Sequence, residues 1–274
     1  MTGKQWRGVV PDSVHDGLDV HGWRVRAAST RGSAHHDAGT PRQDTYMVRH
    51  GHGRLAVVVC DGLGAMELSH LAAEAASAAL AEHLLTAHLE VSGDWTDHLR
   101  VASRAVMRVA GEVLADDAPS LDAVADIMAT TVTAVVVEGI DGPGPWLAHT
   151  ATVGDSSAWW RQTRSGALGF DPWLLMSGGR LTRSEIATSR ALALPLPDDA
   201  VIDGASYEIG TEELLVVCSD GVADAFDDGG SAVAAAFAAG WTNPPRLTEL
   251  ANRISSESSR STDDRTAVAV WTPR

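Results

Sequence analysis

Two segments far apart in the chain each run from an apolar stretch directly into an Asp-Gly pair. Val-Val-Val-Cys-Asp-Gly occupies positions 57–62, and Leu-Leu-Val-Val-Cys-Ser-Asp-Gly occupies positions 214–221. A β-branched apolar run predicts a buried strand, and a glycine at its end allows the chain to turn sharply. Asp61 and Asp220 are therefore expected at the rim of a sheet, where two carboxylates can converge on one cation. Either pair alone is typical of an ordinary turn, so it is the repeat of the whole context that favours a metal site.

The charge of the chain narrows the range of partners. With 36 acidic and 21 basic residues its formal net charge is −15, so a nucleic acid or an anionic membrane surface would repel it. The sequence has no apolar stretch of about 18 residues, the length that predicts a membrane-spanning helix. Residues 1–22 also lack the apolar core of a signal peptide. These features predict a soluble, cytoplasmic protein that binds neither nucleic acid nor membrane.

The sequence contains two cysteines, Cys60 and Cys218, one at each of the two Asp-Gly segments. So few cysteines argue against stabilisation by disulfides. Their equivalent strand contexts leave open that the two are neighbours. The favoured interpretation is that each is a small hydrophobic side chain in a reduced interior.

The order of the predicted elements favours antiparallel sheets with helices packed outside them. Strands are expected at 23–29, 44–49, 54–60, 130–139, 146–155, 213–218 and 266–271, and helices at 67–88, 95–114, 222–239 and 245–258. Because strands outnumber helices and do not alternate with them, a doubly wound parallel sheet is disfavoured.

The chain is expected to form one folded unit behind a short leader. Residues 1–21 are polar and include a proline, which predicts a flexible N-terminal leader. No linker divides the remainder, so residues 22–274 are expected to form a single domain. Within it, residues 162–205 are rich in Gly, Pro and Ser and predict a long irregular excursion.

Four aspartates occupy comparable positions beside predicted strands. Asp44 opens a strand, Asp61 and Asp220 end two others, and Asp263 lies just before the last. Hard cations such as Mg²⁺ and Mn²⁺ prefer carboxylate, carbonyl and water oxygens, and the Gly62 carbonyl could add one more. Two such ions roughly 4 Å apart that share a carboxylate would lower the pKa of a bridging water and hold a phosphate in line for attack. The acids therefore predict hydrolysis of a phosphate monoester without a covalent intermediate.

Six short motifs, in order along the chain, resemble those of the metal-dependent protein phosphatases of the PPM, or type 2C, family. They are PRQD (41–44), DGLG (61–64), ATT (129–131), VGDS (153–156), CSDG (218–221) and DDRT (263–266). The opening stretch GSAHHDAGTPRQD (32–44) is most similar to a bacterial subgroup. The resemblance implies an α+β fold, a four-layer α-β-β-α sandwich with two central antiparallel sheets. It also implies a binuclear Mn²⁺ or Mg²⁺ centre at one end.

The resemblance implies a set of metal ligands made of acids and one backbone carbonyl. They are Asp44, Asp61, Gly62, Asp155, Asp220 and Asp263. Asp61 corresponds to the ligand that bridges two ions, with Asp44 and the Gly62 carbonyl near one of them. Asp220 and Asp263 correspond to ligands of the other ion. Asp155 resembles an acid that helps to bind a weaker third ion in bacterial members.

The catalytic residues implied by the resemblance are Asp44, Asp61 and His36. His36 could hydrogen-bond the phosphate or move a proton, although an exposed or structural histidine is the commoner case. In well-studied members an arginine five residues before the first aspartate grips the phosphate, and that position is Gly39 here. Arg31, Arg42 or His36 could replace it, and a surface salt bridge is the alternative for both arginines.

Two functions of different classes are compatible with these motifs. The favoured one is a Mn²⁺- or Mg²⁺-dependent Ser/Thr phosphoprotein phosphatase whose substrate is phosphorylated by a bacterial Ser/Thr kinase. The alternative is a catalytically weak or inactive phosphatase-like module that binds a phosphoprotein or partner domain, and Gly39 favours it. The retention of all four aspartates favours the enzyme. A metal-dependent phosphodiesterase or nuclease is disfavoured because the chain is acidic and lacks a basic stripe.

Overall fold

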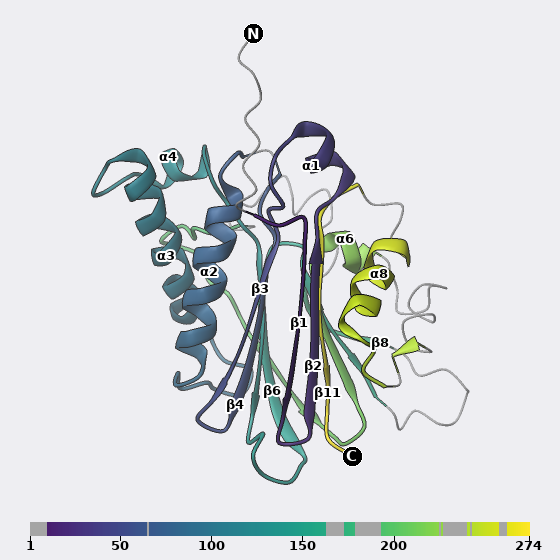
Figure 1. Ribbon diagram of the computed structural model, residues 1–274. Helices are drawn as coiled ribbons and strands as arrows, with labels where there is room; N and C mark the ends of the chain where they lie inside the picture. The colour runs from purple at the N-terminus through teal and green to yellow at the C-terminus, as the bar shows by residue number, and fades with distance from the viewer. Residues whose placement is uncertain are drawn as a thin grey trace.

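Two antiparallel sheets lie face to face between two layers of helices (Figure 1). The computed structural model describes residues 10–64, 66–162, 173–178, 193–224, 226, 240–241, 243–257 and 262–274. The observed architecture confirms the expected α+β fold, a four-layer α-β-β-α sandwich with two central antiparallel sheets.

The first sheet pairs a strand from the N-terminal part of the chain with the last strand. Its strand order is β1-β2-β11-β10-β7-β8. Its strands are β1 (Ser13–Val20), β2 (Trp23–Thr30), β7 (Ser157–Arg161), β8 (Trp173–Gly178), β10 (Leu214–Cys218) and β11 (Arg265–Trp271). Arg265 at the start of β11 lies opposite Thr30 at the end of β2. The segment just before β11 and the segment just after β2 are therefore neighbours at one end of the sheet.

The second sheet has the strand order β3-β4-β5-β6-β9. Its strands are β3 (Thr45–Gly51), β4 (Arg54–Cys60), β5 (Val132–Glu138), β6 (Trp146–Val153) and β9 (Ala205–Ile209). The predicted hairpin between the first two is confirmed, because Gly51 lies opposite Arg54 and Thr45 opposite Cys60. This register brings the start of β3 and the end of β4 to the same end of the sheet.

Helices cover the outer faces of both sheets, and one short helix lies beyond the ends of the strands. The described helices are α1 (Ser33–Ala38), α2 (Ser69–Leu84), α3 (Thr96–Leu114), α4 (Leu121–Ala125), α6 (Asp220–Ala223) and α8 (Leu247–Glu257). The long pair α2 and α3 packs on the second sheet, α6 and α8 pack on the first, and α1 lies beyond the upper ends of the strands (Figure 1). Among the described helices, none has both the length and the apolar character needed to cross a bilayer.

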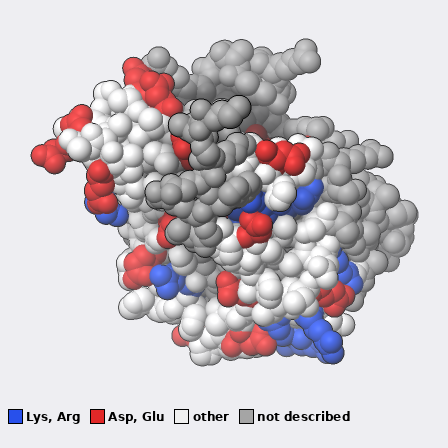
Figure 2. Space-filling model, turned by 45° about the horizontal axis from the view of Figure 1, so that its top comes forward, with Lys and Arg blue, Asp and Glu red and all other residues white. Residues whose placement is uncertain are grey.

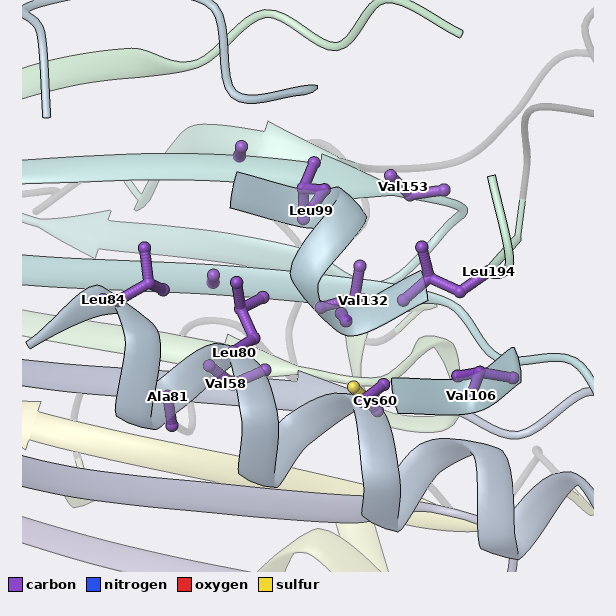
Figure 3. Packing of buried hydrophobic residues seen from close by; sticks show 14 of the residues in the cluster. Val58, Cys60, Leu80, Ala81, Leu84, Leu99, Val106, Val132, Val153 and Leu194 are labelled. Carbon is purple, nitrogen blue, oxygen red and sulfur yellow. The ribbon is translucent and has the colours of Figure 1, made fainter. Parts of the chain in front are cut away.

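Side chains alternate between the two faces of each strand, so the described apolar residues form three clusters, one between the sheets and one under each helix layer. Cys60 lies with Val58 against α2 and α3 (Figure 3). Cys218 lies with Val216 on the outer face of the other sheet, so the two sheets separate the cysteines. Both are free, and burial is the main cause that raises the pKa of each thiol. This environment agrees with the interpretation of both as small hydrophobic side chains.

Residues 13–20 of the predicted flexible leader form the strand β1. Residues 13–20 pair antiparallel with β2, from Ser13 opposite Thr30 to Val20 opposite Trp23. Most side chains of β1 are exposed, so the strand lacks the apolar alternation that reveals strands in a sequence. The hydroxyl of Tyr46 donates to Asp16 Oδ2 at 2.6 Å and fastens β1 to β3 of the other sheet. Residues 1–9 lie outside the described part.

Two further expectations are revised. The excursion predicted at 162–205 contains a regular strand, because β8 pairs with β7. Residues 163–172 and 179–192 of that excursion lie outside the described part. In place of the start of the helix predicted at 222–239, the structure has the short helix α6 at Asp220–Ala223, and most residues of 224–239 lie outside the described part.

A histidine pair between α2 and α3 predicts a loss of stability in mild acid. His83 Nε2 lies 3.0 Å from His98 Nδ1, and burial is the main cause that lowers the pKa of both from 6.5. At these two histidines the unfolded chain therefore binds more protons than the folded protein below about pH 6.5, so the contribution of the pair to the free energy of unfolding decreases as the pH falls. We expect His83→Gln to lose less of this free energy than the wild type between pH 7.5 and 5.5 in urea titrations. An equal loss in both proteins would contradict this role of the pair.

Candidate metal centre

Three aspartates from three separate segments form the heart of the candidate site. Asp61 follows β4, Asp155 follows β6, and Asp220 begins α6 directly after β10 and Ser219. One carboxylate oxygen from each lies within 4.8 Å of the others. Carboxylates that are far apart in the sequence therefore lie together at one end of the two sheets, as the two Asp-Gly segments predict.

Asp44 and Asp263 flank this group. Asp44 precedes β3, is 3% exposed, and accepts a hydrogen bond at Oδ2 from Ser219 Oγ at 2.7 Å. The side chain of Asp263, two residues before β11, is 48% exposed, and its charge contributes to the raised pKa of Asp61. Asp44 is therefore an inner member of the group, whereas Asp263 lies at its open side.

Hydrogen bonds join the motifs that surround the acids. The Asp61 carbonyl accepts from Thr130 Oγ1 and from the Thr131 amide, both at 2.8 Å, and the Asp61 amide donates to Thr131 Oγ1 at 3.2 Å. Thr131 Oγ1 also lies 2.8 Å from Ser156 Oγ, next to Asp155. The main chain of Asp61 is therefore fixed on both sides, which holds its carboxylate in one place.

The glycines of the two Asp-Gly pairs are required by close approach of another motif. Neither Gly62 nor Gly221 is among the described glycines with positive φ, so the expected sharp turn is not their function. A Cβ on Gly221 would lie 2.0 Å from the Asp264 carbonyl oxygen. A Cβ on Gly62 would lie 2.9 Å from both Cβ and the carbonyl oxygen of Gln43. Each glycine thus lets a second acid-bearing segment pack against the corner.

Burial and mutual repulsion raise the pKa of the clustered carboxyls. For Asp61 burial is the largest cause, followed by the charges of Asp44, Asp220 and Asp263, and its pKa lies well above the ordinary value. Burial is also the main cause that raises the pKa of Asp44, Asp155 and Asp220. The ionised cluster is therefore unfavourable by itself, and a bound cation would relieve the repulsion.

The donor atoms suit a hard divalent cation. Asp220 Oδ1 is buried and has no hydrogen-bond partner among the described residues. A buried carboxylate oxygen without a donor is costly unless a cation binds it. Because the ligand atoms of the central group are all carboxylate oxygens, the residues fit Mg²⁺ or Mn²⁺ better than a softer metal.

The face seen in Figure 2 has a mixed charge. Acidic side chains are scattered over its described part, and basic side chains lie near the centre of the view and, in a larger group, at its lower right. With a formal net charge of −15, the chain as a whole attracts cations toward a carboxylate site.

Two adjacent histidines of α1 take opposite directions. The predicted residue, His36, faces outward with its side chain 68% exposed, and its Nδ1 lies 3.7 Å from Asp37 Oδ1. His35 faces inward with its side chain 8% exposed, and its Nδ1 lies 2.9 Å from Asp264 Oδ1. Successive side chains of a helix point about 100° apart, so adjacent residues do not share a face. The structure therefore places His35, and not His36, beside the acids.

The position of the expected phosphate-binding arginine is structurally suited to glycine. Gly39 ends α1 in the left-handed conformation with φ 70°, which an arginine adopts only at a cost. Arg31 forms an ion pair with Asp12, with Nη1 2.9 Å from Oδ1. Arg42 is buried, and its Nη1 donates to the Asp44 carbonyl at 3.0 Å. Arg31 therefore has the ion pair that is its alternative interpretation, whereas Arg42 is held by a backbone carbonyl and not by a surface salt bridge.

Asp264 and Ser219 contribute to the site without having been predicted. Each is adjacent to a predicted ligand within a motif, Asp264 after Asp263 and Ser219 before Asp220. The motifs were thus a signal for both residues. The register in which β11 pairs with β2 decides which of two neighbouring side chains points into the site. The sequence alone does not determine this register.

Comparisons with known proteins agree with this architecture. A sequence model of the family described as protein phosphatase 2C matches residues 31–255. None of the curated proteins compared with the sequence matches it significantly.

Solved structures share the fold at low sequence identity. The serine/threonine phosphatase of S. agalactiae is 16% identical with a TM-score of 0.59, over 95% of this chain and 99% of that chain. The catalytic domain of PstP, a phosphatase known from Mycobacterium tuberculosis, was solved with two manganese ions. It is 21% identical with a TM-score of 0.58, over 92% of this chain and 99% of that chain. RsbX in complex with magnesium is 10% identical with a TM-score of 0.56, over 94% of this chain and 100% of that chain.

Proposed function

Because the chain belongs to the protein phosphatase 2C family, we propose that it is a metal-dependent phosphatase that hydrolyses phosphoserine and phosphothreonine in proteins. The observation that carries this proposal is the convergence of Asp61, Asp155 and Asp220 within 4.8 Å of one another. PstP with two manganese ions and RsbX with magnesium have the same fold, which supports the same cations for this chain.

We infer that the acids hold two ions and contribute to a third. Asp61 would serve both of the first two ions, with Asp44 and the Gly62 carbonyl at one and Asp220 and Asp263 at the other. Asp155 would help to hold the third. When bound, such ions lower the pKa of a coordinated water and neutralise phosphate charge, which are the requirements for hydrolysis of a phosphate monoester.

Residues around the acids fix the orientation of the metal-binding aspartates. Ser219 Oγ donates to Asp44 Oδ2 at 2.7 Å, which fixes the orientation of this carboxylate. Thr130 and Thr131 hold the main chain of Asp61 on both sides. Ligands that are fixed before an ion arrives lose little freedom on binding it, which favours both affinity and a constant geometry.

We infer that the substrate is a phosphoprotein made by a bacterial Ser/Thr kinase in the cytoplasm. A structure from the bacterial stressosome, at 15% identity and a TM-score of 0.59, supports a signalling context through its shared fold. We also infer that residues 13–274 form one domain, because β1 and β11 both pair with β2.

A phosphatase-like module without turnover is the second candidate. Gly39 offers no side chain for the phosphate, and Arg31 and Arg42 are engaged with the protein itself. A module of this kind would bind metal and a phosphoprotein or partner domain but would release no phosphate.

Phosphate release from purified protein tests the proposal. We expect hydrolysis of p-nitrophenyl phosphate and of a phosphothreonine peptide with Mn²⁺ or Mg²⁺, and none with a chelator. Asp220→Ala should reduce the rate by orders of magnitude because it removes a carboxylate of the central group. Absence of turnover in folded, metal-loaded protein would contradict the enzyme and favour the binding module.

A further inference from the structure

The carboxylate of Asp264 ties three segments together next to the candidate metal centre. It is 1% exposed, and its Oδ1 accepts from the Gly32 amide at 2.7 Å. Its Oδ2 accepts from the amides of Gln43 at 2.5 Å and Asp44 at 3.3 Å. The fourth partner is His35, whose Nδ1 lies 2.9 Å from Oδ1. Asp264 thus joins β11 to the start of α1 and to the segment that carries Asp44.

The imidazole of His35 extends this contact toward the loop after Asp61. A Cβ built on Gly64 would lie 3.1 Å from His35 Nε2, so the ring packs directly against that loop. His35 Nδ1 also lies 3.9 Å from Asp263 Oδ1. The ring is therefore placed between the segments of Asp61 and Asp263, and it is held there by a buried carboxylate.

His35, Asp263 and Asp264 also bring possible ligand atoms within 4.8 Å of one another, but the hydrogen bonds of Asp264 leave it poorly suited to bind an ion. Both oxygens of Asp264 already accept hydrogen bonds from backbone amides, and one of them also pairs with His35. A carboxylate so fully occupied has little capacity left for a cation. Its position one residue after Asp263, and its bond to the Asp44 amide, instead fix the backbone that carries two predicted ligands.

We propose that His35 and Asp264 form a positioning pair that sets the geometry of the metal-binding aspartates Asp44 and Asp263. The inference rests on the proposed function, because it concerns the same metal centre. The pair acts through Asp44 and Asp263, without itself contacting an ion. Partners that orient ligands in this way commonly change metal affinity by about 10- to 100-fold when they are removed.

The test is the dissociation constant of Mn²⁺, measured by isothermal titration calorimetry on the full chain. We expect His35→Ala to weaken Mn²⁺ binding by about 10-fold or more. His35→Asn places an amide donor near the position of Nδ1 and should recover most of the affinity. His50→Ala, which removes an exposed histidine of β3, is the matched control and should bind as the wild type does.

Two outcomes would overturn the inference. One is wild-type affinity in His35→Ala, and the other is equal weakening by the Ala and Asn variants, which would indicate only a loss of packing. If His35→Ala does not fold, as judged by circular dichroism, the comparison of His35→Asn with His35→Leu replaces it, because both substitutions fill part of the space of the ring. His36→Ala serves as a further arm, since weakening by this variant alone would assign the role to the outward-facing histidine.

Failure of the proposed function has a different signature. If the wild type binds no Mn²⁺, the metal centre itself is wrong. If the wild type binds Mn²⁺ and hydrolyses a phosphopeptide while His35→Ala binds equally well, only the positioning pair is wrong.

Discussion

Replacing Asp61 with asparagine should abolish stabilisation by metal and reduce phosphatase activity by orders of magnitude. A ligand that binds only the folded state stabilises it by about 2.7 kcal/mol when present at about 100 times its dissociation constant. We expect Mn²⁺ to raise the free energy of unfolding of the wild type by this order and to leave Asp61→Asn unchanged. The reason is that one carboxylate serves both ions, so its loss weakens both sites. Thermal unfolding with and without Mn²⁺ measures the difference.

The same variant should show the opposite behaviour in a chelator. Burial and three neighbouring acids raise the pKa of Asp61, so its ionised form is unfavourable without a cation. Metal-free Asp61→Asn should therefore be at least as stable as the metal-free wild type. Asp97→Asn is the control, because the side chain of Asp97 is 92% exposed on α3. Full metal-dependent turnover in Asp61→Asn would show that the bridging assignment is wrong.

Gly221→Ala is expected to cost about 3 kcal/mol of stability, at the upper end of typical overpacking effects. The added Cβ would lie 2.0 Å from the backbone oxygen of Asp264, and backbone cannot move aside as a flexible side chain can. Relief of this clash must shift the segment of Asp263 and Asp264 away from Asp220. We therefore expect weaker Mn²⁺ binding together with a lower urea midpoint.

Gly142→Ala is the matched control for this substitution. Its Cβ would meet nothing closer than 3.6 Å, and Gly142 is exposed in the turn between β5 and β6. The expected change is within about 0.5 kcal/mol. Equal effects of the two alanines would contradict the conclusion that close approach, and not general backbone entropy, requires glycine at the Asp-Gly corner.

Most of the fold could be predicted because buried strands are strongly apolar. The runs that end at Cys60 and Cys218 belong to interior strands whose apolar residues are buried, so their sequences clearly indicate strands. β1 could not be predicted, because it is an edge strand with mostly exposed side chains. Its position depends on backbone pairing and on contacts such as Tyr46 with Asp16, which leave no periodic pattern.

The site was predictable where a residue's chemistry alone determines its role. Asp44, Asp61, Asp155 and Asp220 follow from acids at strand ends and from motif order, and the structure brings them together. His35 and Asp264 do not follow in this way, because each stands beside a residue of the same type. Helix phase decides between His35 and His36, and strand register decides between Asp263 and Asp264.

Counting bound metal ions tests the central claim most directly. Purified chain, freed of metal with a chelator, is dialysed against increasing Mn²⁺, and the bound ions are counted while electron paramagnetic resonance reports whether they interact. The arrangement of the acids predicts two tightly bound, magnetically coupled ions per chain, with a third only at higher concentration. A folded protein that binds no Mn²⁺, or only single uncoupled ions, would contradict a binuclear centre at Asp61.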